Sequence, residues 1–315
     1  MLIGLTFDKS RIKLPLLMEN ITKVTITAPA KVNFYLRVLR KRPDGYHDLD
    51  SFMQALELSD TVTVSRAGSG IEVSCDRGDV PAGPGNIAYR AAESLLGLAG
   101  EGAGVRIHIE KRIPVAAGLG GGSSDAAAVL RGMNILFGLG LTDALLREAG
   151  RPLGADVPFF LSWPSARAEG VGEVLTATLP PEETWLVLVN PGFSVSTAWV
   201  YGNLKLVLTN ISNSIRLPAS EGQAYGAGLL ALCLDNDLER VTAERYPEIN
   251  EIKGQLISEG AKGALMSGSG PTVFGVFADR AVAEAACKRI SRPGWTVLTT
   301  RTIKSWPSPV VSGRL

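Results

Sequence analysis

Residues 114–128 read Pro-Val-Ala-Ala-Gly-Leu-Gly-Gly-Gly-Ser-Ser-Asp-Ala-Ala-Ala, so four glycines and two serines directly precede an alanine run. Glycine reaches backbone conformations closed to other residues and lets a ligand approach the main chain. The free N–H groups at the start of a helix point outward and carry partial positive charge. A glycine-rich turn that leads into a helix is therefore suited to binding phosphate, and it predicts a nucleotide site.

The segments on either side of this loop have the periodicity of a strand and of a helix. Residues 105–110 alternate between apolar and polar, which predicts a half-buried strand. The apolar residues that recur at helical spacing after the loop are Val129, Leu130, Met133, Leu136 and Phe137. We expect Ser123 or Ser124 to be the N-cap of this helix. Both common phosphate-loop patterns, G-x-x-x-x-G-K-[ST] and G-x-G-x-x-G, are missing from the sequence, so a flexible turn before a core helix is the alternative interpretation.

Composition restricts the class of protein. The chain has 315 residues, of which 45% are hydrophobic and 20% charged, as in a globular protein long enough for two domains. Its net charge of +1 gives no electrostatic reason to expect nucleic acid or an anionic membrane as a partner. The three cysteines are far apart, which argues against a disulfide framework or a zinc site and fits a reducing compartment. The apolar runs in the sequence are too short to span a bilayer.

Strands and helices are mixed along the chain without regular alternation, which favours an α+β fold. Strands are predicted at residues 23–28, 33–39, 60–65, 71–75, 105–110, 184–189, 264–266, 272–277 and 295–300. Helices are predicted at 86–98, with Asn86 as N-cap, and at 126–137, 142–149, 247–260 and 280–290. An irregular connection is expected at 202–226. We expect an N-terminal arm at 1–20, two domains at 21–175 and 176–303, and a loose tail at 304–315.

Three separated motifs together resemble those of a known superfamily. They are Pro-Ala-Lys-Val-Asn at 29–33, the glycine-rich loop, and Ser-Gly-Ser-Gly-Pro-Thr at 267–272. In their order and rough spacing they resemble the GHMP kinases, named for galactokinase, homoserine kinase, mevalonate kinase and phosphomevalonate kinase.

Three further motifs narrow this resemblance. They are Arg-Pro-Asp-Gly-Tyr-His at 42–47, Gly-Ala-Asp-Val-Pro at 154–158 and Glu-Gly-Val-Gly-Glu at 169–173. They look like the branch of the superfamily that acts on a cytidine diphosphate-linked methylerythritol. The resemblance runs from about residue 27 to 277 and weakens over 203–235.

The resemblance implies a two-domain α+β fold, the GHMP kinase fold. Residues 21–175 would form an ATP-binding domain like domain 2 of ribosomal protein S5, and residues 176–303 a ferredoxin-like domain, with the active site between them. The implied reaction moves the γ-phosphoryl group of ATP to the tertiary 2-hydroxyl of the cytidine-linked methylerythritol, with Mg²⁺ on the nucleotide. This step belongs to the non-mevalonate pathway to isoprenoid precursors.

The resemblance assigns the catalytic roles to Asp156 and Lys31. A carboxylate can accept or orient the proton of an attacking hydroxyl as transfer proceeds. An ammonium beside it would hold the carboxylate ionised and stabilise charge on the phosphoryl group. Without the family pattern, Asp156 would be interpreted as a turn residue and Lys31 as a solvated surface charge.

The same resemblance makes the glycine-rich loop the cradle for the ATP phosphates. The loop residues are Pro114, Val115, Ala116, Ala117, Gly118, Leu119, Gly120, Gly121, Gly122, Ser123 and Ser124. Ser124 is the expected protein contact to Mg²⁺, an ion that often keeps mostly water and phosphate ligands. Asn86 and Lys111 match positions that contact the adenosine, although helix capping and surface charge are the ordinary roles of such residues.

A pyrimidine site needs an aromatic face and directed polar groups. Tyr46 and His47 match the cytidine-binding pair of the family, and Tyr201 falls where an aromatic residue covers the cytosine. Asn33 and Thr197 are expected to line the substrate pocket. The second glycine-rich turn would close over the site near the phosphates, although such a turn alone would be an ordinary hairpin turn. Its residues are Gly268, Ser269 and Gly270.

Two alternatives stay open at this point. A GHMP kinase of the homoserine or mevalonate type would not need the Asp-Gly-Tyr-His motif at 44–47, because those substrates lack a pyrimidine. A non-catalytic nucleotide-binding regulator would not need both Lys31 and Asp156. The expected partners are small molecules, and the protein is expected to be a monomer or weak homodimer. We expect it in the bacterial cytoplasm, or in the plastid stroma if the host is a plant or alga.

Overall fold

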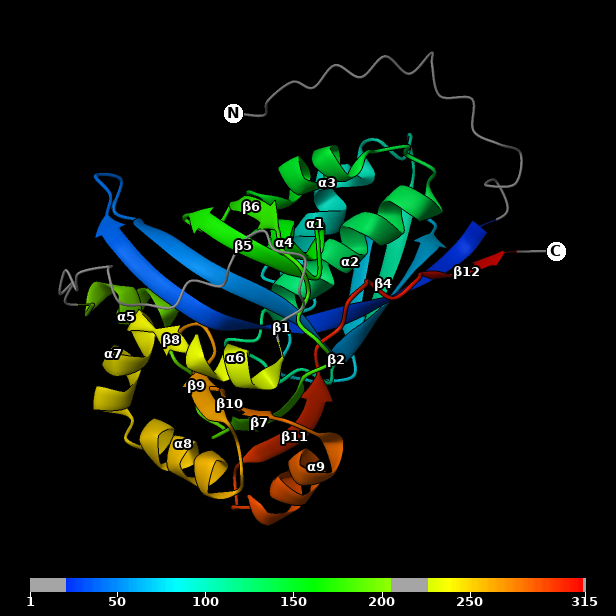
Figure 1. Cartoon of the computed structure of the whole chain (residues 1–315). Helices are drawn as coiled ribbons and strands as arrows, with labels where there is room; N and C mark the ends of the chain where they lie inside the picture. The colour runs from blue at the N-terminus through cyan, green and yellow to red at the C-terminus, as the bar shows by residue number, and fades with distance from the viewer. Residues whose placement is uncertain (1–20, 205–225, 314–315) are drawn as a thin grey trace.

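The computed structural model describes residues 21–204 and 226–313, which form two β-sheets packed face to face with helices on their outer sides (Figure 1). Three apolar cores separate the layers: one under the first group of helices, one between the sheets, and one under the second group of helices. Among the described residues, no helix is both long and apolar enough to cross a membrane.

The large sheet is formed mainly by the N-terminal half of the chain. Its strands follow the order β12-β1-β2-β4-β3, with β5 and β6 extending from β2 and the short β8 paired to β1. The bounds are β1 (Ile21–Lys41), β2 (His47–Ala67), β3 (Gly70–Cys75), β4 (Gly104–Glu110), β5 (Ser165–Gly170), β6 (Val174–Ala177), β8 (Asp235–Asn236) and β12 (Val310–Gly313). The strands predicted at 23–28 and 33–39 are one strand, β1. Its register against β2 shifts between Pro29 and Lys31 and again between Asn33 and Tyr35, without breaking the strand.

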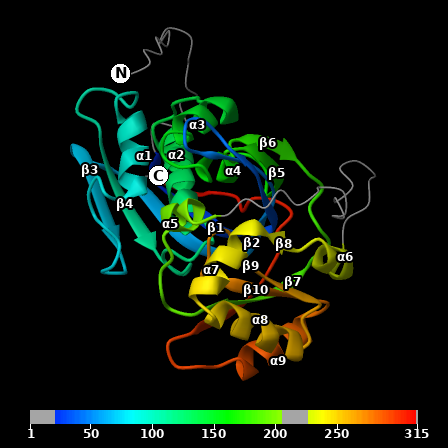
Figure 2. The same ribbon diagram turned by 90° about the vertical axis from the view of Figure 1, so that its left-hand side faces the viewer.

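One group of helices covers the outer face of this sheet (Figure 2). These helices are α1 (Ile87–Leu96), α2 (Gly121–Leu136), α3 (Asp143–Gly150) and α4 (Val157–Phe160). The apolar side chains that recur along α2, among them Val129 and Met133, are fully buried against the sheet. Removing each such side chain from water contributes about 1.5–3 kcal/mol, which is why the helical periodicity in the sequence predicts this packing.

The N-cap of α1 agrees with the sequence prediction, whereas that of α2 differs from it. Asn86 caps α1, because its side chain accepts a hydrogen bond from the Ala88 N–H at 2.9 Å. The prediction of Ser123 or Ser124 as N-cap of α2 is wrong: the helix begins at Gly121, after Gly120. Gly120 has a φ of 72°, so the chain turns into the helix through a left-handed glycine and needs no serine cap.

The small sheet has the order β11-β7-β10-β9, and each neighbouring pair is antiparallel. The last strand of the domain in sequence, β11, therefore lies beside the first, β7. A ferredoxin-like domain, which the resemblance implies, has this strand order. The bounds are β7 (Trp185–Asn190), β9 (Gly263–Met266), β10 (Val273–Phe277) and β11 (Thr296–Arg301). The helices of this half are α5 (Thr197–Gly202), α6 (Ala227–Leu232), α7 (Asp237–Arg245), α8 (Glu248–Ser258) and α9 (Arg280–Arg289). In Figure 1, α8 and α9 lie on the side of this sheet that faces away from the large one, whereas α7 lies beside the small sheet and contacts β1.

A shared apolar core holds the two sheets together. Val32 and Phe34 of β1 and Phe52 of β2 meet Leu186 and Phe274 of the small sheet. The rings of Phe34 and Phe274 make an edge-to-face contact, with centroids 5.7 Å apart and planes at 87°. This core fixes the position of the second domain against the strands that carry the site.

The C-terminal segment differs from the loose tail expected at 304–315. The indole N–H of Trp306 donates to the carbonyl oxygen of Ser162 at 3.0 Å, and its ring packs against Phe159 and Phe160. β12 then pairs antiparallel with β1. The unpaired edge of β1 accepts this strand, a long-range contact that local composition does not reveal. The arm expected at 1–20 lies outside the described residues, as does most of the connection expected at 202–226.

Candidate active site

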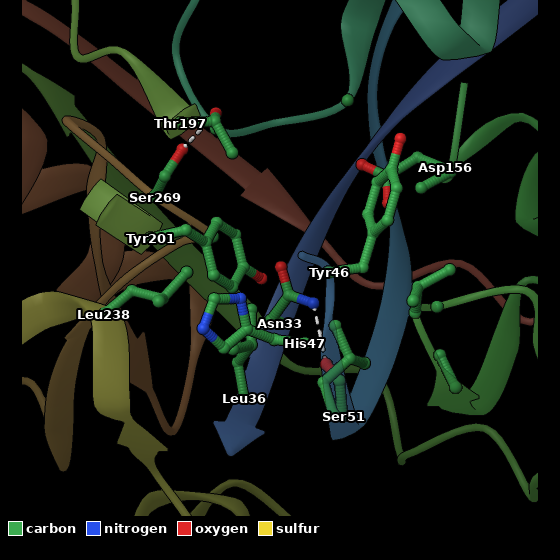
Figure 3. A pocket seen from close by; sticks show the side chains of 18 of the residues that line it. Asn33, Leu36, Tyr46, His47, Ser51, Asp156, Thr197, Tyr201, Leu238 and Ser269 are labelled. Atoms are coloured by element: carbon green, nitrogen blue, oxygen red, sulfur yellow. Dashed lines mark hydrogen bonds between the residues drawn. The ribbon is translucent and has the colours of Figure 1, made fainter. Parts of the chain in front are cut away.

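A cavity of about 670 Å³ lies where the large sheet, the glycine-rich loop and the C-terminal domain meet (Figure 3). Strands β1 and β2 contribute Lys31, Asn33, Leu36, His47 and Ser51. The other residues discussed below that line it are Tyr46, Gly118, Gly120, Ser123, Asp156, Thr197, Tyr201, Leu238, Gly268 and Ser269. Both domains therefore supply side chains to the same space.

Strand β1 directs Lys31 and Asn33 into this cavity. Alternate residues of a strand face the same side, so these two side chains share one face while Val32 lies in the core between the sheets. The register shift between Asn33 and Tyr35 then changes the alternation, and Leu36 becomes the next β1 residue that lines the cavity.

Lys31 and Asp156 lie side by side at the surface of the cavity. The Lys31 Nζ is 3.4 Å from Oδ2 of Asp156, and it donates a hydrogen bond to Oδ1 of Asn33 at 2.7 Å. The lysine side chain is 5% exposed and the aspartate side chain 36% exposed. A positive and a negative group are thus held next to each other within reach of a ligand in the cavity.

The glycine-rich loop packs closely against the second glycine-rich turn. Gly118 has a φ of 77°, and a side chain there would place its Cβ 2.3 Å from the carbonyl oxygen of Ser267. Only glycine fits this position. The helix that follows makes its first backbone hydrogen bond from Ser124 N–H to the Gly120 carbonyl, at 2.9 Å. The N–H groups before Ser124 have no partner within the helix, so they form a site for an anion.

Ser123 and Ser124 face different sides of the first turn of α2. Ser123 lines the cavity, whereas Ser124 is 2% exposed and borders a small hollow beside Arg131 and Trp306. Adjacent residues of a helix point in directions about 100° apart, since a turn takes about 3.6 residues. The contact of Ser124 with Mg²⁺ stays a prediction, and Ser123 is the serine that lines the cavity.

Helix α7 holds the second glycine-rich turn. The Nδ2 group of Asn236, at the start of this helix, donates to the carbonyl oxygens of Met266 and Gly268, each at 2.8 Å. Gly268 lines the cavity, while Gly270 is not among the residues that line it. The hydrogen bonds from Asn236, together with the bond from the Ser267 N–H to the Thr272 carbonyl within the turn, therefore fix its position.

Two residues expected to contact adenosine have side chains engaged elsewhere. Asn86 caps α1 and donates to the carbonyl of Pro81 at 2.8 Å. Lys111 is buried and forms ion pairs with Asp60 and Asp125. Burial raises the pKa of Asp125 to about 7, although the Lys111 charge acts in the opposite direction. Neither Asn86 nor Lys111 lines the cavity, and their contact with adenosine stays a prediction.

One end of the cavity is aromatic. The His47 and Tyr201 rings stack with centroids 5.1 Å apart and planes at 29°. Burial lowers the pKa of His47 below its ordinary 6.5 and raises that of Tyr201 to about 12, so both are uncharged near neutral pH. Tyr46 is 65% exposed at the rim. The hydroxyls of Thr197 and Ser269 lie 2.8 Å apart, on the same side of the cavity as Tyr201 and across from Tyr46 (Figure 3).

Leu36, Ser51 and Leu238 also line the cavity, and the sequence motifs do not assign them to the site. Ser51 lies four positions after His47 in the same strand, so the alternation of β2 alone indicates that it faces the same side. Leu36 reaches the cavity only through the register shift, and Leu238 comes from a helix of the other domain. No local signal identifies these two.

Comparison with known proteins places these features in a family. The chain matches the models described as GHMP kinases N terminal domain, at residues 86–162, and GHMP kinases C terminal, at residues 223–294. It is 53% identical over 284 residues to a 4-diphosphocytidyl-2-C-methyl-D-erythritol kinase of Geobacter metallireducens, a match that covers 89% of this chain and 99% of that protein. The chain belongs to the 4-diphosphocytidyl-2-C-methyl-D-erythritol kinase family of the GHMP kinases.

Solved structures agree with this family membership. A crystal structure of 4-(cytidine 5'-diphospho)-2C-methyl-D-erythritol kinase matches with a TM-score of 0.73 at 36% identity, over 88% of this chain and 98% of that one. A homoserine kinase from Cytophaga hutchinsonii matches with a TM-score of 0.68 at 18% identity, over 92% and 98%, which shows the common fold alone. As a member of the 4-diphosphocytidyl-2-C-methyl-D-erythritol kinase family, the chain is an ATP-dependent kinase, and both alternatives left open by the sequence lose their support.

Proposed function

We propose that this chain transfers the γ-phosphoryl group of ATP to the 2-hydroxyl of 4-diphosphocytidyl-2-C-methyl-D-erythritol, giving the 2-phosphate and ADP. The observation that carries the proposal is the Lys31–Asp156 pair, 3.4 Å apart, between a phosphate-binding loop and an aromatic wall. The family to which the chain belongs supports the same reaction, a step toward isoprenoid precursors.

The ATP phosphates would bind on the glycine-rich loop, at the N-terminus of α2. The unpaired N–H groups and the helix dipole there favour negative charge. The Ser123 hydroxyl at this end of the cavity fits Mg²⁺, which prefers oxygen ligands and would neutralise phosphate charge when bound. Within residues 21–204 and 226–313, no three His, Cys, Asp or Glu side chains gather as a metal site. Most ligands of the ion would therefore be phosphate and water.

Lys31 and Asp156 would act on the two reacting groups. Phosphoryl transfer depends mainly on positioning and charge stabilisation, because its transition state is loose. Asp156 would orient the 2-hydroxyl and accept its proton as the bond to phosphorus forms. Lys31 would donate a hydrogen bond to the transferring phosphoryl group, while its contact with Asn33 holds it in place.

The cytosine would occupy the aromatic end of the cavity. Tyr46 and Tyr201 offer ring faces for stacking. The neutral imidazole of His47 has one donor and one acceptor nitrogen, which suits the polar edge of a pyrimidine. Asn33, Thr197 and Ser269, which also line the cavity, would contact the remaining polar groups of the substrate.

Product analysis tests the proposal. With Mg·ATP and the cytidyl substrate, ³¹P NMR is expected to show one new phosphomonoester signal and an equal amount of ADP, while the pyrophosphate signals of the substrate persist. A sample without the cytidyl substrate is the control and should release almost no ADP. A new phosphoanhydride signal other than those of ADP, or free phosphate in place of the monoester, would contradict transfer to the 2-hydroxyl.

A further inference from the structure

A chain of three hydrogen bonds runs along the wall of the cavity and ends at Lys31. The Ser51 hydroxyl donates to the Tyr35 carbonyl at 2.7 Å. The Asn33 Nδ2 donates to Ser51 Oγ at 2.8 Å (Figure 3). The Lys31 Nζ donates to Asn33 Oδ1 at 2.7 Å. Every member of this chain comes from the paired strands β1 and β2.

The groups at the two ends of this series of hydrogen bonds determine which atom donates and which accepts in each bond. A carbonyl only accepts, so the single hydrogen of the Ser51 hydroxyl is used on Tyr35, and Ser51 can then only accept from Asn33. An ammonium only donates, so Asn33 must turn its oxygen toward Lys31. Both ends therefore require the same orientation of the Asn33 amide.

Burial makes this orientation hard to replace. Ser51 is 1% exposed, Asn33 3% and Lys31 4%, so water has little access to substitute for a missing partner. If the Asn33 amide turned over, its nitrogen would face the Lys31 ammonium, donor against donor, in a buried place.

The register shift in β1 allows both Asn33 and Tyr35 to form hydrogen bonds with Ser51. Ser51 pairs with Leu36 across the strands, and the shift lies between Asn33 and Tyr35. Because of this irregularity, the side chain of Asn33 and the carbonyl of Tyr35 both reach the same serine.

We propose that Ser51 is a positioning residue for phosphoryl transfer: it holds the Asn33 amide in the orientation that directs Lys31 toward Asp156. The inference rests on the proposed function, because it assumes that Lys31 and Asp156 are the reacting pair. Ser51 itself would act through Asn33 and not on the phosphoryl group.

The first test compares three variants by steady-state kinetics. Ser51→Ala is expected to lower kcat roughly 10- to 100-fold, with smaller changes in KM, since the reacting groups lose alignment rather than affinity. Ser51→Thr keeps the hydroxyl and should restore most of the rate. Ser165→Ala is the matched control, because Ser165 is also 1% exposed and its hydroxyl lies 2.8 Å from that of Thr178, away from the cavity. An equal loss of kcat in Ser165→Ala, or no loss in Ser51→Ala, would overturn the proposal.

A double-mutant comparison separates positioning from a general structural role. If Ser51 acts through Asn33, then Asn33→Ala and the double variant Asn33→Ala/Ser51→Ala should have the same kcat. If the two losses instead multiply, Ser51 acts independently of Asn33 and the proposal is wrong.

A readout without catalysis distinguishes failure of this inference from failure of the proposed function. In ¹⁵N-asparagine-labelled protein, the Asn33 Nδ2 protons should exchange slowly with solvent in the wild type and in Ser51→Thr, and rapidly in Ser51→Ala. Asn33→Ala assigns the signal. Rapid exchange of these protons in the wild type would overturn the inference. If exchange is slow but the protein does not phosphorylate the cytidyl substrate, Ser51 still holds Asn33, and only the proposed reaction is rejected.

Discussion

Lys31 shows how a charge is tolerated in a nearly buried place beside the site. Its ammonium meets two oxygen atoms, Oδ1 of Asn33 and Oδ2 of Asp156. A buried ammonium without such partners would be strongly destabilising. The groups that replace water around Lys31 also orient it toward the cavity, so one arrangement serves both folding and the proposed reaction.

Replacing Asp156 by alanine is expected to abolish turnover while ATP affinity changes by no more than a few fold, because the carboxylate acts on the acceptor hydroxyl. ADP release gives kcat, and calorimetry on the same preparation gives the nucleotide Kd. Asp79→Ala is the control, since Asp79 pairs with Arg77 on the surface. A near-normal kcat in Asp156→Ala would remove this residue from the mechanism.

His47 is expected to make stability depend on pH below neutrality. Burial, with a smaller effect of Lys41, lowers its pKa in the folded state below 6.5, so the unfolded chain binds a proton there more readily. Stability from His47 is therefore complete above pH 6.5 and declines as the pH falls from 6.5 through the lowered pKa. Melting temperatures of wild type and His47→Gln from pH 8 to 5 measure this. Parallel curves for the two proteins would contradict it.

At the scale of elements, one buried ion cluster ties three segments together beneath the glycine-rich loop. Lys111, which follows β4, bridges Asp60 of β2 and Asp125 of α2. Asp60 also accepts the backbone N–H groups of Arg112 at 2.6 Å and Ile113 at 2.8 Å. The cluster fixes where α2 begins relative to the sheet, and hence where its N–H groups meet a phosphate.

Lys111→Met is expected to lower the free energy of unfolding by about 3–5 kcal/mol, because it leaves two buried carboxyl groups without their cation. Urea denaturation measures the change. Lys253→Met is the control: its ion pair with Glu239 is more exposed, so its loss should cost at most about 1 kcal/mol. If Lys111→Met were as stable as the wild type and raised only the KM for ATP, the adenosine contact would be its main role.

Local sequence patterns are sufficient to predict the positions of many helices and strands. The helices α1, α3, α8 and α9 lie where apolar periodicity and capping residues predict them, within a few residues. The sequence pattern predicts separate strands at 23–28 and 33–39, whereas pairing with β2 keeps β1 continuous between them. The pairing of β12 was not predictable, since it joins segments from opposite ends of the chain.

The candidate site was predicted from motifs rather than from periodicity. Lys31 and Asp156 are far apart in sequence, and only the fold brings them within 3.4 Å. The side toward which Ser124 points depends on where α2 begins, and the burial of Lys111 depends on Asp60. These features follow from contacts between distant segments, which a single sequence does not display.

At the scale of the whole molecule, the cavity exists because two domains pack against each other. The core between the sheets joins them. The C-terminal segment returns to the first domain, where Trp306 packs on α4, the helix that begins directly after Asp156. The short helix that follows Asp156 is therefore packed against a residue from the C-terminal segment. A phosphate-binding loop from one domain and a closing turn from the other then face the same ligand space.

The most direct test of this account is a comparison of acceptor substrates. The kcat/KM for ADP release by the purified protein with Mg·ATP would be measured with 4-diphosphocytidyl-2-C-methyl-D-erythritol, homoserine and mevalonate. We expect efficient turnover with the cytidyl substrate alone. Preferred turnover of homoserine or mevalonate, or ATP binding without turnover of any of the three, would contradict it.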